Sequence, residues 1–215
     1  MSRTTLLAAA LTIAGCAAQT NDWLIVPGKR VGPINASTTR ADLVRLFGAA
    51  NVTEGETSIA DTGPLKCTRV FEKHADTTLT ILWAENKRFK QLEAIILCEQ
   101  AADNACRWRM ADGTGFGTTL KTLEKMNGRP FKINGFGWDY GGAVTSWEGG
   151  RLEAWQTPCG NVALSLNPTE AATQSPDYRK VMGEAEFLSS TPSLQRLDPR
   201  ISSIQFSFGE QKGCR

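Results

Sequence analysis

The feature that most constrains the fold is a short helix motif that occurs twice. The stretch TTRADLVRLFG at 38–48 is matched by TTLKTLEKMNG at 118–128, with a constant offset of 80 residues (118 − 38 = 80). In each copy threonine precedes apolar residues at helical spacing and glycine follows them, which is typical of a capped and terminated helix. The repeat predicts two similar structural units, and a chance likeness between two short helices is the alternative.

Strand patterns follow the first motif. The runs CTRVFEK at 67–73, TTLTILWA at 77–84 and QLEAIILC at 91–98 are rich in β-branched residues and are separated by short polar connections. The first two alternate between apolar and polar residues, as strands with one solvated face do. The pattern predicts an antiparallel meander directly after the first helix.

A second likeness links the two halves of the chain. The segment from Trp83 to LEAI is echoed by the segment from Trp147 to LEAW. We therefore expect EGG at 148–150 to form a hairpin turn, after which the chain returns as a strand. VALSLN at 162–167 and ISSIQFSFG at 201–209 predict two further strands.

These elements predict an α+β fold of two tandem units, each a short helix packed on an antiparallel sheet. With 215 residues, of which 41% are hydrophobic and 21% charged, the chain can build one domain or two small ones. A stretch rich in Pro, Ser and Thr predicts a long surface connection with a helical turn near 178–182. The expected segments are a signal peptide at 1–15, an N-terminal tether at 16–30, a first unit at 31–111, a second unit at 112–167, and the connection with a closing strand at 168–215.

The stretch GFGWDYGG at 135–142 holds four of the 20 glycines around three aromatic residues and a carboxylate. Glycine allows a close backbone approach, which suits either a twisted hairpin or a ligand site. We favour the hairpin, with the aromatic residues as core. The alternative is a sheet face that binds a partner, because aromatic residues are enriched at interface cores. Its candidate residues are Phe136, Trp138, Asp139, Tyr140, Trp147 and Trp155.

The N-terminal stretch has the layout of a secretory signal. It carries a basic residue at Arg3, an apolar run from Leu6 to Ile13, and small residues before Cys16. The letters IAGC resemble the bacterial lipobox, which implies cleavage before Cys16, diacylglycerol on its sulfur, and a membrane anchor. Alanine at position 17 favours the outer membrane, facing the periplasm. An ordinary cleaved signal with an incidental cysteine is the alternative.

Five of the six cysteines lie beyond Cys16. Export places them in an oxidising compartment, where pairing is expected. Cys98 and Cys106 are separated by a short loop, and a bridge from Cys159 to Cys214 would hold the C-terminus; this leaves Cys67 alone. The sequence does not determine the connectivity. With no CxxC and no histidine at metal spacing, we expect no metal site.

Few residues suggest catalysis. The single histidine, His74, lies in the polar connection KHAD, and no nucleophile elbow accompanies it. The GTGFG run at 113–117 fits a flexible turn before a capped helix better than a phosphate cradle. Asp139 and Glu148 could instead form the carboxylate pair of a glycan hydrolase, with Glu153 nearby. We expect no catalytic residue and no cofactor, and the hydrolase remains the rival hypothesis.

The repeated TTxxxLxx[LM]xG helix with its antiparallel sheet resembles the tandem units of beta-lactamase-inhibitor-like proteins and the SmpA/OmlA class of outer-membrane lipoproteins. The resemblance covers Gly32 to Asn167 and depends on Thr39, Leu43, Leu46 and Gly48 with their counterparts. GRP at 128–130 nearly fits the proline that these families place after the helix, whereas GAA at 48–50 departs from it. The resemblance implies a binding or assembly module without catalysis.

The sequence therefore predicts a non-enzymatic envelope lipoprotein that binds another envelope protein on the periplasmic side. Twenty-four basic and 22 acidic residues leave a net charge of +2, which does not favour a nucleic-acid partner. A structural spacer with no specific partner is a third possibility.

Overall fold

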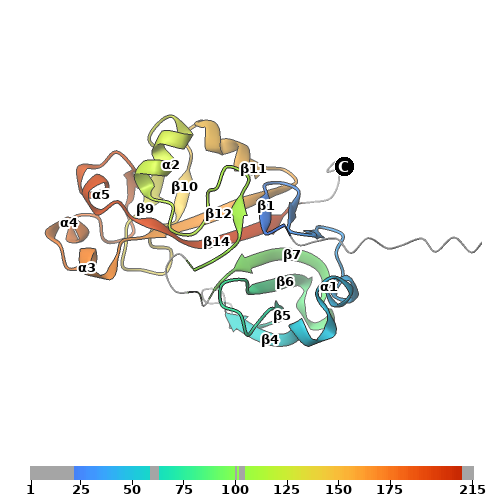
Figure 1. The fold of residues 1–215 in the computed structure, drawn as a ribbon. Helices are drawn as coiled ribbons and strands as arrows, with labels where there is room; N and C mark the ends of the chain where they lie inside the picture. The colour runs from blue at the N-terminus through green and yellow to red at the C-terminus, as the bar shows by residue number, and fades with distance from the viewer. Residues whose placement is uncertain (1–21, 59–62, 100, 102–104, 210–215) are drawn as a thin grey trace, which may run out of the picture.

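The computed structural model of the chain describes residues 22–58, 63–99, 101 and 105–209 and shows an α+β fold dominated by sheet (Figure 1). This confirms the predicted fold class. The helices among the described residues are all short: α1 (Arg40–Phe47), α2 (Leu120–Asn127), α3 (Glu170–Thr173), α4 (Pro176–Arg179) and α5 (Pro192–Leu197).

The largest sheet has seven antiparallel strands in the order β11-β12-β14-β7-β6-β5-β4. Its strands are β4 (Val52–Ser58), β5 (Pro64–Val70), β6 (Leu79–Glu85), β7 (Lys90–Leu97), β11 (Gln156–Thr157), β12 (Gly160–Asn167) and β14 (Arg200–Phe208). The three predicted runs at 67–73, 77–84 and 91–98 overlap β5, β6 and β7, although β5 already ends at Val70, and the two later runs overlap β12 and β14. These five strand predictions are confirmed.

Two smaller sheets complete the fold. One has the order β10-β9-β13, formed by β9 (Lys132–Asn134), β10 (Val144–Ser146) and β13 (Glu186–Leu188). The other has the order β3-β2-β1-β8, formed by β1 (Leu24–Val26), β2 (Arg30–Val31), β3 (Ile34–Asn35) and β8 (Arg109–Met110), of which β1 and β8 are parallel.

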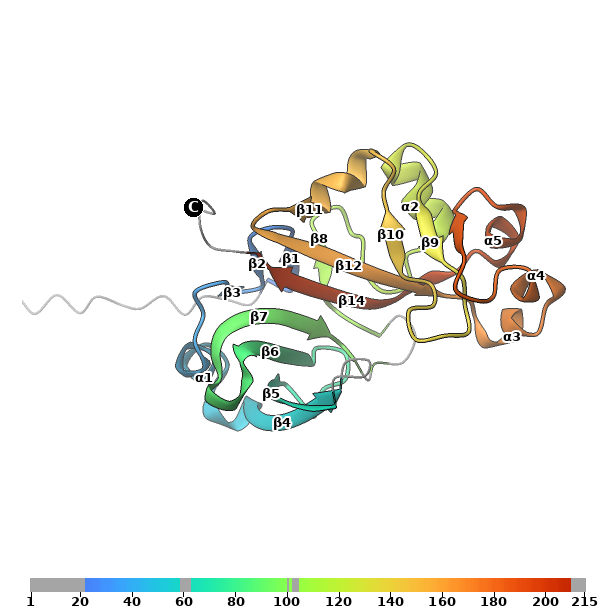
Figure 2. The ribbon, with the colours of Figure 1, turned by 180° about the vertical axis from the view of Figure 1, so that it is seen from behind.

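Each of the longer helices is followed by a series of antiparallel strands. After α1 come β4, β5, β6 and β7, each paired with the next. After α2 come β9 and β10, then β12 through a bridge between Ala143 and Ser165, and finally β14. The last strands of the two series, β7 and β14, pair with each other (Figure 2). One continuous sheet therefore joins both halves, and the unit boundaries within it stay a prediction.

The helix motif gives the same local structure in both copies. The bounds of α1 and α2 differ by the offset of the repeat (120 − 40 = 80). The hydroxyl of Thr39 accepts a hydrogen bond from the Asp42 amide at 3.2 Å, and that of Thr119 accepts one from the Thr122 amide at 3.3 Å. A glycine follows each helix, so the predicted caps and ends are confirmed.

The predicted strand after EGG is wrong, because Arg151–Trp155 forms a 3-10 helix. The Arg151 guanidinium donates to the Met126 carbonyl at 2.9 Å, and the Leu152 amide donates to Asn127 Oδ1 at 3.0 Å. Both acceptors lie at the C-terminal end of α2. This tertiary contact uses a backbone donor that a strand would have paired, so the likeness to the LEAI segment of β7 is one of sequence only.

The predicted surface connection holds more structure than expected. It contains α3, α4, β13 and α5, of which the sequence suggested one helical turn. Its Pro, Ser and Thr residues act as helix starts: Thr169 and Ser175 cap α3 and α4, and Pro176 and Pro192 occupy the first turns of α4 and α5. The Pro, Ser and Thr residues that predicted a loop therefore mark the starts of short helices.

The large sheet has one face in the core and one face that is largely outside it. Side chains such as Leu79, Ile81, Ile95 and Phe206 belong to the main core cluster, together with α1, α2 and the small sheets. On the opposite face Cys67, Leu82 and Ala94 form a separate small cluster with Ile96.

Candidate binding surfaces

The GFGWDYGG stretch forms the loop that joins β9 to β10. The Gly142 amide donates to the Asn134 carbonyl at 3.1 Å, and the Ala143 amide donates to the Tyr140 carbonyl at 3.2 Å. The side chain of Asn134 also donates to the Tyr140 carbonyl, at 3.2 Å. We expected these residues to enter the sheet, but they form a closed turn ahead of β10.

Backbone contacts from elsewhere hold this loop in place. The Phe136 amide donates to the Val181 carbonyl at 2.9 Å, and the Gly183 amide donates to the Phe136 carbonyl at 2.8 Å. Gly142 has φ of 72° and lies so close to the Leu166 carbonyl that any Cβ would collide with it. The loop is therefore fixed on two sides, and its glycine content follows from close packing.

Three of the six partner-binding candidates are buried. Phe136 is stacked on Tyr178 at a centroid distance of 5.6 Å. Trp147 and Trp155 are buried and meet edge to face at 5.6 Å. These three rings fill the core, as the hairpin interpretation expected, and they offer no surface to a partner.

The other candidates lie at the surface. Trp138 is half-buried, and its ring nitrogen donates to the Gly135 carbonyl at 2.8 Å. Its ring meets that of Tyr140 edge to face at 5.4 Å, and Tyr140 is 55% exposed. Met182, which is 45% exposed, reaches toward Gly137 of the same loop. We call Trp138, Asp139, Tyr140 and Met182 the aromatic loop patch.

The patch has a defined place in the molecule. The loop between β9 and β10 lies toward α3 and α4, whereas β1, β3 and α1 lie toward the other end (Figures 1 and 2). Met182 could not be assigned to this patch from the sequence, because it lies more than 40 residues further along the chain than Tyr140 (182 − 140 = 42). No local pattern could have placed it there.

A second surface is a hollow in the outer face of the large sheet, with a volume of about 590 Å³. We call it the sheet hollow. It is lined by residues of β5, β6, β7 and β14 and of the turn between β6 and β7. The lining includes Leu82, Ala94 and Ser207, together with Leu65, Asn86 and Glu93. The sequence did not suggest it, because these residues are spread over four strands and a turn.

The carboxylates of the rival hydrolase hypothesis lie at opposite ends of β10. Asp139 is exposed in the loop before this strand, and Glu148 follows it. Glu148 accepts a hydrogen bond from Ser146 Oγ at 2.7 Å and pairs with Lys132 at 3.6 Å. The hydrogen bond from Ser146, and then the Lys132 charge, hold the pKa of Glu148 below its usual range. A general acid needs a raised pKa, so these contacts favour a structural role for Glu148.

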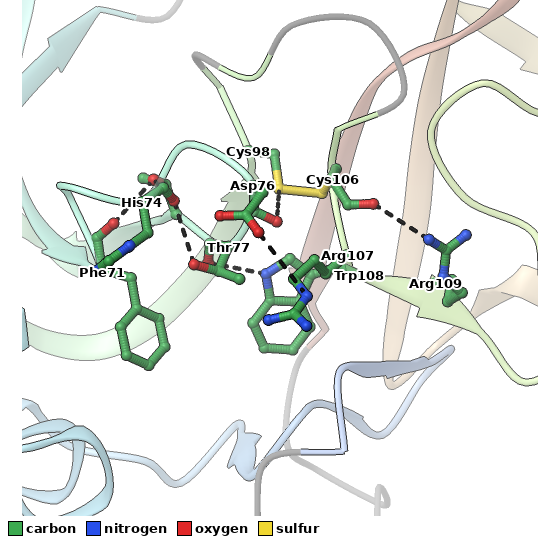
Figure 3. The surroundings of a disulfide bond; sticks show 10 residues. Phe71, His74, Asp76, Thr77, Cys98, Cys106, Arg107, Trp108 and Arg109 are labelled. Atoms are coloured by element: carbon green, nitrogen blue, oxygen red, sulfur yellow. Dashed lines mark hydrogen bonds and ion pairs between the residues drawn. A yellow bond between two sulfur atoms is a disulfide. The ribbon is translucent and has the colours of Figure 1, made fainter.

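The predicted Cys98–Cys106 disulfide is present (Figure 3). It ties the end of β7 to the segment that leads into Trp108. There the Arg107 amide donates to the Asp76 carbonyl at 2.8 Å, and the Trp108 ring nitrogen donates to the Thr77 carbonyl at 3.0 Å. The disulfide therefore holds the link between the two halves against the turn before β6.

The other cysteines agree with the prediction as far as the structure describes them. Cys67 is a free, buried thiol, and burial raises its pKa. Cys159 is disulfide-bonded. Its predicted partner Cys214, like the signal sequence and Cys16, lies outside the described residues.

The remaining candidates show structural contacts. His74 is exposed, and its backbone carbonyl accepts hydrogen bonds from the amides of Thr77 and Thr78, as in a turn. In the run before α2, the Gly117 amide donates to the Ile201 carbonyl at 2.9 Å, which packs it against β14. Within the described ranges, no group of His, Cys, Asp and Glu side chains could hold a metal ion. None of the helices described is long and apolar enough to cross a bilayer.

Comparisons with protein-family models, with curated proteins and with solved structures found no match. The fold alone does not define an activity, because one fold supports many functions. The two surfaces are therefore the basis for the functional interpretation.

Proposed function

We propose that this protein is a non-enzymatic lipoprotein of the bacterial cell envelope that acts as a protein-binding or assembly module. In this proposal Cys16 carries the lipid anchor and the aromatic loop patch contacts the partner. The observation that carries the proposal is the exposure of Tyr140 beside Trp138 on a loop whose backbone is fixed.

A fixed loop with exposed aromatic rings suits binding for two reasons. Tyrosine and tryptophan are the residues most enriched among those that dominate binding energy. A loop already held in one conformation loses little further entropy when a partner binds. The hydrogen bonds of Trp138 to Gly135 and of Phe136 to Val181 provide this rigidity.

The position of the patch also supports a protein partner. Five residues separate Cys16 from Asp22, the first described residue, so even a fully extended chain keeps the anchor within roughly 20 Å of Asp22. The patch lies toward the opposite end of the molecule from β1 and β3 (Figures 1 and 2). An anchor on Cys16 would therefore leave the patch free to face the periplasm.

Site-specific crosslinking in the native host tests the proposal. A photoreactive phenylalanine analogue at position 140 should give one discrete adduct with another envelope protein, and Trp138→Ala in the same chain should weaken it. The analogue at Lys73, which is exposed outside the patch, is the matched control and should give none. No adduct from position 140, or equal adducts from both positions, would contradict the proposal.

The rival hypothesis needs its own variants. Glu148→Gln, which lies outside the aromatic loop patch, should leave any envelope phenotype unchanged if the protein binds rather than cleaves, and Asp139→Asn removes the other carboxylate of the rival pair. A glycan-cleaving activity that disappears in both variants, while their circular dichroism stays that of the wild type, would replace the binding proposal. Intact mass of the native protein tests the anchor, because Cys16 should be the lipid-bearing first residue.

A further inference from the structure

The helix α2 carries a stripe of positive charge that α1 lacks. Lys121, Lys125 and Arg129 follow one another at intervals of four residues, and all three line one groove of about 420 Å³. Residues at this spacing lie on the same side of a helix, and Arg129 extends the stripe just beyond the helix end at Gly128. Gln195 of α5, which lies beside α2, completes the lining (Figures 1 and 2). We call this surface the α2 groove.

The helix itself does not require this stripe, as the first copy of the motif shows. At the offset of 80 residues, Lys121 and Arg129 correspond to Ala41 and Ala49 (121 − 80 = 41 and 129 − 80 = 49). The helix α1 nevertheless has the same length as α2, the same N-cap residue type and the same terminal glycine. Capping and packing therefore account for the helix and leave these two cations unexplained.

The third cation, Lys125, also differs from its counterpart. Arg45 in α1 forms an ion pair with Asp42, which lies three residues earlier on the same helix. The equivalent position in α2 is Thr122, and Lys125 makes no ion pair with any described residue. Lys125 and Lys121 are like charges one turn apart, an arrangement that destabilises a helix slightly. An anion bound between them would remove this repulsion.

Acidic groups near the α2 groove balance only part of its positive charge. Glu124 also lines it, and its Oε2 accepts hydrogen bonds from Ser189 Oγ and from the Gln195 side chain. Asp198 lies 4.0 Å from the Lys121 ammonium. Three cations against one carboxylate leave the lining with a charge of +2 (3 − 1 = 2), as large as the net charge of the whole chain. The groove therefore attracts anions.

Arg129 is held in place by the backbone next to it. Its Nη1 donates to the Glu148 carbonyl at 2.8 Å, which leaves Nε and Nη2 as further donors. The guanidinium makes no ion pair in the part of the chain that the structure describes. A positioned guanidinium beside two ammonium groups suits a compact anion with several oxygens, because each oxygen accepts charge-assisted hydrogen bonds.

We propose that the α2 groove binds the phosphate group of a small soluble phosphate monoester. Such a group carries roughly 1.5 to 2 negative charges at neutral pH and three acceptor oxygens. Arg129 donates to the phosphate oxygens, and the ammonium groups of Lys121 and Lys125 pair with the remaining negative charge. The inference does not depend on the aromatic loop patch, because the groove lies before β9 and the patch follows β9.

Other anionic ligands fit the groove less well. Each carboxylate of an acidic peptide carries a single charge, so balancing the groove would require several of them in a small space. A lipid would bring acyl chains, but the described residues that line the groove include no large apolar side chain, so burial there would gain little. The volume of about 420 Å³ lies within the usual range for small-ligand sites, roughly 300 to 1,000 Å³.

Glycerol 3-phosphate is a suitable probe, because it is a phosphate monoester with a small polar body. Titration into the purified full chain should shift the backbone amide NMR signals of Lys125 and Gly128. The methyl diester of the same compound has only one negative charge and should bind about tenfold more weakly. No shift with the monoester, or equal affinity for the diester, would overturn the proposal.

Variants of the two helices assign the binding to the groove. Lys125→Gln should weaken binding of glycerol 3-phosphate about tenfold, because it removes one charged hydrogen bond. Arg45→Gln is the matched control, since Arg45 has the same position in α1 (125 − 80 = 45), and it should bind as the wild type does. Arg129→Lys keeps the charge but loses the planar fork, so it should weaken binding by a smaller factor. Wild-type affinity in Lys125→Gln, or an equal loss in Arg45→Gln, would overturn the assignment.

Two further probes test the source of the phosphate. Dihexanoyl phosphatidic acid carries the same monoester on a lipid body, and hexaglutamate carries carboxylates only. Affinity for the lipid probe that does not exceed that for glycerol 3-phosphate supports a soluble ligand. Tighter binding of the lipid probe would overturn the soluble source and assign the phosphate to a headgroup. Tighter binding of hexaglutamate would replace the proposal by a site for an acidic peptide.

Discussion

The two halves of this chain start from the same helix motif and then differ in how regular their sheets are. After α1, the strands β4 to β7 are seven or eight residues long and follow one another directly. After α2, β9 and β10 have three residues each, a 3-10 helix interrupts the path to β12, and α3, α4, β13 and α5 precede β14.

This difference matches the two candidate surfaces. The aromatic loop patch arises in the second half, where an interrupted sheet leaves a loop that other segments must hold. The sheet hollow is lined mainly by residues of β5, β6 and β7, which belong to the first half. Residues of β14 complete its lining. A loop held by other segments therefore presents large rings in one half, whereas long strands with small side chains and a β-bulge after Leu82 border the hollow in the other.

The largest expected effect tests the packed loop of the second half. Gly142→Val places a β-branched side chain at a positive φ and against the Leu166 carbonyl, so unfolding free energy should fall by at least about 3 kcal/mol. Gly183→Ala is the matched control, because Gly183 also has a positive φ but open space around it. It should cost about 1 kcal/mol. Equal midpoints of the two variants in urea would show that the loop tolerates movement.

The next effect concerns the link between the halves. Replacing Cys98 and Cys106 together by alanine removes a short loop closure, which should lower the unfolding free energy by about 2.5 kcal/mol. Denaturant titration under non-reducing conditions measures it. A midpoint like that of the wild type would mean that the contacts of Trp108 and Arg107 alone hold the link.

The sequence predicted an element correctly where the contacts that form it lie close together in the chain, and wrongly where they come from distant residues. Thr39 and Thr119 cap their helices through bonds to residues three positions away, so the motif itself predicted both helices. The 3-10 helix at Arg151–Trp155 depends on contacts with Asn127 and the end of α2, about 25 residues earlier in the chain. Because this cause is not local, the sequence pattern wrongly predicted a strand here.

The same distinction applies to the surfaces. The letters around Trp138 and Tyr140 suggested a recognition element, but only packing decides that Phe136 turns inward and Tyr140 outward. The sheet hollow needed the register of β6, β7 and β14, which places Leu82, Ala94 and Ser207 in one row. Register depends on the whole sheet, so no single stretch of sequence could have shown it.

A smaller effect sharpens the comparison of the two helices. Both caps should be worth about 1 kcal/mol, as Thr39→Ala and Thr119→Ala would measure. The cap of α1 is reciprocal, because the Asp42 carboxylate accepts from the Thr39 amide at 2.8 Å, whereas α2 has Thr122 at the equivalent position. We expect Asp42→Ala to destabilise more than Thr122→Ala, by a few tenths of a kcal/mol. The reverse order would mean that packing, and not capping, determines where α1 begins.

The smallest expected effect is a pH dependence that arises from one carboxyl group of the second half, that of Asp177. Asp177 on α4 accepts hydrogen bonds from Arg196 on α5 at 2.7 Å and from Ser193 at 2.9 Å. These bonds, that of Arg196 first, hold the pKa of Asp177 well below its usual range. A carboxyl whose folded pKa is lowered contributes stability above its unfolded pKa, about 3.9, and loses it as the pH falls toward the folded value.

Asp177→Asn should therefore be less stable than the wild type at neutral pH, and the difference should shrink as the pH falls below about 4. Thermal unfolding followed between neutral and acidic pH measures this convergence. Asp139→Asn, at an exposed loop position, is the control and should keep the wild-type acid response. A constant gap between wild type and Asp177→Asn at all pH values would mean that the α4–α5 contact depends on shape and not on the charge of Asp177. The inserted helices would then be held as the regular half is, by packing.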